Sequence, residues 1–76
     1  MTIQEINGST YKTTTFEIGK TKYSVTVVEG KSNYINVLKH SAIRSLGKDY
    51  QNFDEAVSSY KNPQIKVELL KIEMGF

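Results

Sequence analysis

The chain has 76 residues, of which 38% are hydrophobic and none is cysteine. A chain of this length holds one small core, because such a domain removes only about 60% of its unfolded surface from water. The lack of cysteine excludes a disulfide scaffold, a zinc knuckle and a thiol nucleophile. No apolar run approaches the roughly 20 residues that span a bilayer, and the first residues show no secretory signal pattern. We therefore expect one soluble, cytoplasmic domain over residues 1–76, with no role in a membrane.

Charge is unevenly distributed along the sequence. The net charge is +2, but residues 20–48 hold six cations and one acid, which makes that stretch +5 and leaves −3 for the rest. Such an asymmetry is typical of a surface that meets a polyanion. A run of lysines is also typical of the solvated side of a sheet, where it discourages pairing with other sheet edges. Both interpretations stay open at this point.

Three segments of the first half alternate with the period of a strand. They are Tyr11–Ile18, Lys22–Glu29 and Tyr34–His40, and each is rich in β-branched or aromatic residues. The turns between them are only a few residues long, so neighbouring strands are predicted to run antiparallel as a meander. One side of the meander is then predicted to point into the core, through Tyr23, Val25, Val27, Ile35 and Val37.

Two further segments are weaker strand candidates. Residues 47–51 follow a stretch without periodicity, and we favour a brief fourth strand there. Residues 1–10 are predicted to form either a short strand or a loose arm. The meander is therefore expected to contain three to four strands.

The last part of the chain has the periodicity of helices. Asn52 is a good N-cap with Glu55 at the third helical position, as in a capping box. Asn62-Pro63 interrupts this helix and starts a second one, which should run to about Met74 and stop at Gly75. The predicted fold is α+β, with two C-terminal helices packed on one sheet face. The first helix should face the core through Phe53, Ala56, Val57 and Tyr60.

The second helix carries two apolar rows, one formed by Ile65, Leu69 and Ile72. The other row is rotated by about 200° at 100° per residue. One row should cover the sheet, and the other needs a cover of its own. That cover comes either from within the chain or from outside it. The internal candidates are Phe53 and Tyr60 of the preceding helix, or Ile3 and Ile6. We predict a homodimer in which the interface residues are Val67, Leu70 and Met74.

The sequence offers no organised catalytic, cofactor or metal site. The single histidine, His40, has serines nearby in sequence but no nucleophile elbow. The one adjacent acidic pair, Asp54-Glu55, lies in a first helical turn, where negative charge favours the helix dipole. Gly19-Lys20-Thr21 carries the last letters of a Walker A motif without its earlier glycine, so we interpret it as a turn. We therefore expect a non-enzymatic protein without cofactors or metals.

The outward side of the sheet is the predicted functional surface. It combines tyrosines, which stack on bases, with small polar residues and lysines, which contact phosphates. With one arginine in the chain, bidentate reading of bases by arginine is limited. The alternative is a protein-interaction module, an inhibitor or adaptor that acts through this face or the last helix. The predicted nucleic-acid-binding residues are Tyr11, Lys22, Lys31, Tyr34, Lys39, Arg44 and Lys48.

The segment at residues 47–56, Gly-Lys-Asp-Tyr-Gln-Asn-Phe-Asp-Glu-Ala, resembles the end of the sheet and the helix start in AP2 and integrase arm-type DNA-binding domains. In element order the chain also resembles the strands-then-helix unit of Whirly single-stranded-DNA-binding proteins, which dimerise through helices. The resemblance implies a DNA-binding module of phage or bacterial type. The arginines and tryptophans of an AP2 sheet are absent, so Lys22, Lys31 and Lys39 would contact the backbone of a single strand.

Overall fold

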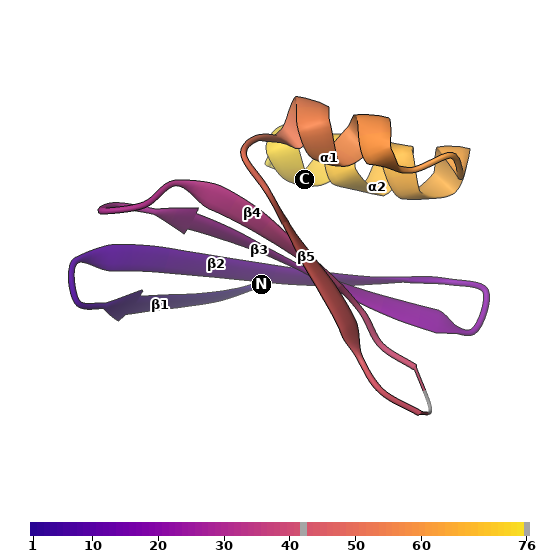
Figure 1. Cartoon of the computed structure of the whole chain (residues 1–76), viewed down its shortest axis with the longest axis horizontal. Helices are drawn as coiled ribbons and strands as arrows, with labels where there is room; N and C mark the ends of the chain where they lie inside the picture. The colour runs from indigo at the N-terminus through magenta and orange to yellow at the C-terminus, as the bar shows by residue number, and fades with distance from the viewer. Residues whose placement is uncertain (42, 76) are drawn as a thin grey trace.

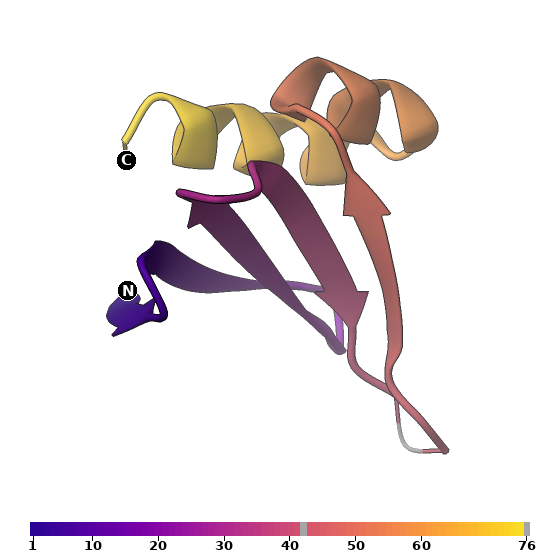
Figure 2. The same cartoon turned by 60° about the vertical axis from the view of Figure 1, so that its left-hand side comes forward.

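The computed structural model describes residues 1–41 and 43–75 as a two-layer α+β domain. Five antiparallel strands form one sheet in the order of the sequence, and two helices follow (Figure 1). Figure 2 shows both helices on the same face of the sheet, with the first strand at the edge away from them. The elements are β1 (Thr2–Ile6), β2 (Ser9–Ile18), β3 (Thr21–Glu29), β4 (Tyr34–Lys39), β5 (Leu46–Tyr50), α1 (Phe53–Ser59) and α2 (Pro63–Glu73).

The predicted meander with two C-terminal helices is confirmed, but the predicted number of strands was too low. The additional strand is β1, which pairs with β2 from Thr2↔Thr13 to Ile6↔Ser9. Asn7 and Gly8 connect them with positive φ values of 51° and 83°. Two consecutive residues of this conformation form the type I′ turn that suits a two-residue hairpin. All five residues of β1 are exposed, so burial imposes no alternation on its sequence.

The core lies between the helices and the strands β3 to β5. Val25 and Val37 face each other across β3 and β4, and both are almost completely buried. Phe16 extends this layer onto β2, where its ring stacks on Tyr23 with the centroids 5.2 Å apart. The predicted inward side of the sheet is therefore confirmed. The buried core residues are Tyr23, Val25, Ile35, Val37, Tyr50, Ala56, Ile65 and Leu69.

Both helices begin at the predicted caps. The Asn52 side-chain oxygen accepts a hydrogen bond of 2.8 Å from the backbone N–H of Glu55. The Glu55 carboxylate accepts in turn from the backbone N–H of Gln51, one residue before the cap. Asn62 caps α2 in the same way, with Pro63 in the first turn. These caps satisfy N–H groups that have no partner within a helix, so they fix where each helix leaves the sheet.

The turn after β3 packs closely against the turn after β1. Gly30 has a φ of 141°, and a Cβ atom there would lie 2.6 Å from the Gly8 carbonyl oxygen. A side chain at this position would therefore clash with backbone as well as strain its own conformation. This contact holds the β1–β2 hairpin against the rest of the sheet at the end away from the β2–β3 turn.

Candidate nucleic-acid interface

The outer face of the sheet, opposite the helices, brings two of the predicted residues together. Tyr11 and Tyr34 are the cross-strand neighbours of Val28, one on each side. Val28 is only 3% exposed although no helix lies on this face. Residues paired across antiparallel strands share a face, so the two partly buried tyrosines flank this valine. Part of the surface of these two rings therefore covers Val28 and is not free to stack on bases.

The strands place few cations on this outer face. In the described strands its charged residues are Lys22, Glu17 and Asp49. Lys22 is paired across the strands with Glu17, and the Asp49 carboxylate accepts a hydrogen bond of 2.8 Å from the Asn36 amide. Two carboxylates against one ammonium give this face no positive potential. Electrostatic attraction of a phosphate chain therefore needs another surface.

Two of the predicted lysines lie on the helix side of the sheet. Lys39 is paired with the buried Tyr23, and Lys48 with the buried Val37. Both line a hollow of about 410 Å³ together with Lys61, which belongs to the link between α1 and α2. We call this site the basic hollow, and none of its lining residues is acidic. It is lined by Tyr23, Val37, Lys39, Leu46, Gly47, Lys48, Tyr50, Tyr60, Lys61, Asn62 and Ile65.

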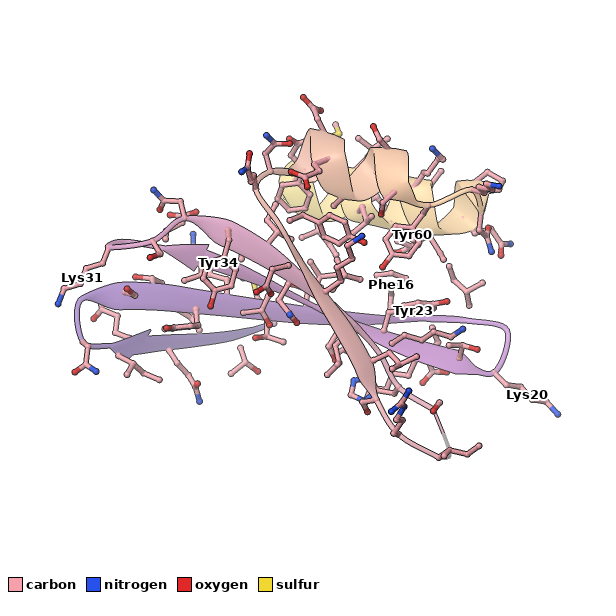
Figure 3. All side chains as sticks on the ribbon, viewed as in Figure 1. Phe16, Lys20, Tyr23, Lys31, Tyr34 and Tyr60 are labelled. Carbon is pink, nitrogen blue, oxygen red and sulfur yellow. The ribbon has the colours of Figure 1, made fainter. Side chains whose placement is uncertain are left out.

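Tyrosines form the inner wall of the basic hollow. The rings of Tyr50 and Tyr60 lie 6.3 Å apart and are tilted by 53°. The Lys48 ammonium lies 5.5 Å from the centre of the Tyr50 ring, within the range of a cation–π interaction. Figure 3 shows Tyr23 and Tyr60 between the sheet and the helices. Burial, together with the neighbouring Tyr50, raises the pKa of the Tyr60 hydroxyl above its ordinary value, so this group stays neutral and can donate.

The other predicted cations lie apart from the basic hollow. Lys31 is in the turn between β3 and β4, and Arg44 is in the connection between β4 and β5. Figure 3 shows Lys31 at one end of the sheet and Lys20 at the other. Of the predicted binding residues, the basic hollow therefore contains Lys39 and Lys48 but not Lys31. It also contains Lys61, which was not predicted.

His40 has two serine neighbours, one of them distant in sequence. Its Nε2 atom lies 2.8 Å from the Ser24 hydroxyl on β3, and its Nδ1 atom lies 3.4 Å from the Ser45 hydroxyl. The backbone N–H of His40 also donates to the Lys22 carbonyl. These contacts tie the end of β4 to β3 and to the connection that leads into β5. Within residues 1–41 and 43–75, no group of three or more His, Asp or Glu side chains could hold a metal ion.

The predicted dimer residues form an exposed row on α2. Val67, Leu70 and Met74 are 49%, 42% and 69% exposed. Ile3 and Ile6, considered as an internal cover, are themselves more than half exposed. The opposite row packs on the sheet, as Leu69 shows by its complete burial. In the described residues nothing buries this row, and Val67 lines a hollow of about 380 Å³ with Ile18 and Gly19 at the β2–β3 turn.

A second hollow of about 570 Å³ lies at the other end of the helix layer. It lies where the inner side of β1 to β3 meets the first turn of α1 and the end of α2. Its lining includes exposed apolar residues of the N-terminal strand and both signs of charge. The lining residues are Met1, Ile3, Lys12, Thr14, Val27, Glu29, Phe53, Ile72, Glu73 and Gly75.

No family model matches the chain, no curated protein matches it, and no solved structure matches it. Neither helix described in the structure is long and apolar enough to cross a membrane.

Proposed function

We propose that this domain is a non-enzymatic nucleic-acid-binding protein that binds single-stranded DNA through the basic hollow. The observation that supports this proposal is the convergence of three lysines from separate elements on a site without a carboxylate. Lys39, Lys48 and Lys61 come from β4, β5 and the α1–α2 link, and all three are exposed. In the described residues the only ion pair is the one between Lys71 and Glu68, so the three ammonium groups are available to phosphates.

The topology extends this positive region beyond the hollow. In the meander, the β2–β3 turn and the β4–β5 connection lie at the same end of the sheet. That end carries Lys20 and Arg44 in addition to the lysines of the hollow, whereas Lys22 lies on the outer face and is paired with Glu17. The one acid among residues 20–48, Glu29, lies at the opposite end of β3. Most of the charge asymmetry of the sequence is thus an asymmetry in space, and it provides a path for a phosphate backbone.

The mode of binding follows from the kinds of residue present. Lysines act as point charges for phosphates, whereas sequence reading in a groove relies mainly on bidentate side chains such as arginine. The only arginine, Arg44, lies in the connection before β5. Aromatic rings beside lysines are the usual combination of single-strand sites. We therefore propose backbone-tracking, weakly sequence-selective binding of a single strand.

A titration at two salt concentrations tests this function. Fluorescence anisotropy would follow a labelled thymidine strand of about 20 nucleotides and a duplex control. If three or four phosphates are neutralised, affinity for the single strand should fall about 20- to 50-fold between roughly 50 and 200 mM salt, at a slope of about −0.7 per phosphate. Absence of binding at the lower salt concentration, or binding that does not respond to salt, would contradict the proposal.

A protein-interaction module is the second candidate function. It is favoured by the exposed row of Val67, Leu70 and Met74, because apolar groups at this exposure are normally scattered rather than aligned on one helix. The same row supports the proposed homodimer, since a two-fold contact needs only one self-complementary surface. Tight binding of a protein partner without affinity for nucleic acid would favour this second function.

A further inference from the structure

We propose that the basic hollow seats one unpaired nucleotide of the bound strand, with a phosphate among Lys39, Lys48 and Lys61 and the base against Tyr60. This inference rests on the proposed function and specifies how one unit of the strand is held. It differs from a general attraction between a basic surface and a polyanion, because it assigns a ring contact and a phosphate contact to the same hollow.

The size of the hollow fits one nucleotide. Its volume of about 410 Å³ is within the range of roughly 300–1,000 Å³ that is usual for small-molecule sites. Its walls come from the inner face of the sheet on one side and from the α1–α2 link on the other. A base reaches such a recess only when it is unstacked and unpaired, so a duplex must first lose pairing there. A base seated in the hollow would therefore come from a single strand.

The charges of the hollow fit a phosphate. Lys39 and Lys48 project from neighbouring strands, and Lys61 reaches the same space from the helix layer. None of the lining residues is acidic, so no neighbouring carboxylate competes for these ammonium groups. Lys48 is also held over the ring of Tyr50, which limits the positions of its ammonium group. Three donors around one recess suit the several oxygens of a phosphate.

Tyr60 is the ring that a base can reach. Tyr23 and Tyr50 also line the hollow, but they are only 7% and 5% exposed. Tyr60 is partly exposed, and its ring is supported from behind by Tyr50. A base placed against this ring would lie next to Lys61, the following residue of the chain.

The test compares hollow variants with matched controls outside the hollow, using the same labelled thymidine strand. Lys61→Gln removes one charge from an exposed side chain of the hollow, and Lys31→Gln removes one from an exposed turn at the other end of the sheet. Lys61→Gln should weaken binding and lower the salt slope by about 0.7, whereas Lys31→Gln should change neither. Tyr60→Leu should weaken binding about five-fold or more, and Tyr60→Phe should keep most of the affinity.

Folding is checked separately, because Tyr60 also packs against the core. A cooperative thermal transition of Tyr60→Leu is required before its affinity is interpreted, and Lys61→Gln tests the site without touching the core. Equal losses for Lys61→Gln and Lys31→Gln, with salt-dependent binding intact in the wild type, would overturn the nucleotide seat and leave the proposed function standing. No binding by the wild type would overturn both.

Discussion

The centre of the sheet and its first edge, β1, have side chains that point to the same face but differ in whether helices cover them. Val25 on β3 and Ile3 on β1 point to the same side of the sheet, yet Val25 is completely buried and Ile3 is 58% exposed. Ala56 and Leu69 of the helices pack in one core with residues of β3 to β5, whereas all five residues of β1, at the edge away from the helices, stay exposed (Figure 2). The orientation of a side chain in a strand therefore decides only which face it joins. Burial depends on whether a second layer covers that face.

The uncovered edge depends on different forces from the covered part. β1 is attached by its backbone pairing with β2 and by the close packing of the Gly8 and Gly30 turns. It buries little apolar side chain, so it should open locally at a lower free energy than β3 or β4. The covered part is stabilised by apolar burial between two layers. Substitutions of the same kind should therefore have very different effects in the two regions.

The largest difference is expected between Val25→Asp and Ile3→Asp. Val25→Asp places an unpaired carboxylate between the sheet and the helices, which costs several kcal/mol and is comparable to the whole stability of a small domain. Ile3→Asp places the same group at a half-exposed site opposite Lys12, and should cost about 1 kcal/mol or less. Thermal denaturation followed by circular dichroism measures both. A cooperative transition of Val25→Asp close to that of the wild type would contradict the comparison.

The helix that provides the cover allows a second, smaller comparison. Leu69 is completely buried on the sheet, and Leu70, the next residue, is 42% exposed. Leu69→Ala should lower the free energy of unfolding by about 2–5 kcal/mol through lost burial and the cavity that remains. Leu70→Ala should change it by about 0.5 kcal/mol or less in the monomer. Urea denaturation at low protein concentration separates the two, and similar losses would mean that the helix presents a different face to the sheet.

Much of this fold could be predicted from local patterns in the sequence. The alternation around Val25 and Val37 assigned the inner face correctly, because burial on one side of a strand imposes a period of two. Asn52 and Asn62 marked both helix starts, since their side chains satisfy backbone N–H groups locally. Features like these depend on near neighbours in the chain, and so they remain visible without the structure.

The first strand was harder to predict, because β1 has no buried side. Its residues are exposed on both faces of the sheet, so apolar and polar residues do not alternate between a buried and an exposed face. The usable signal was Asn7-Gly8, a dipeptide that favours the type I′ turn of a hairpin. That turn implies a strand on each side of it.

The candidate site was predicted only in part. Alternate residues of a strand share one face of the sheet, and this rule was not applied to the lysines. Lys39 has the same parity as Val37, and Lys48 has the same parity as Tyr50, so both could have been assigned to the helix side. Lys61 carries no such signal. Its position depends on how the link between the helices returns over β5, which is a result of tertiary packing.

The smallest effect on folding is expected at the exposed row of α2. This row is uncovered in the single chain, and a second copy of the chain would cover it in the proposed dimer. Leu70→Glu should leave the monomer folded, because the side chain already faces solvent in this structure. In a dimer through this row it would bring two like charges together across the two-fold axis and remove apolar burial of about 1.5–3 kcal/mol per fully buried side chain.

Sedimentation at high micromolar concentration tests this last expectation. The wild type should sediment as a dimer and Leu70→Glu as a monomer. Gln4→Glu is the matched control, because it adds the same charge to an exposed position of β1, away from α2, and should leave the dimer intact. A wild-type monomer at that concentration would contradict the dimer. The row would then be an apolar surface that the isolated chain leaves in water, and the protein-interaction function would become the better explanation of its exposure.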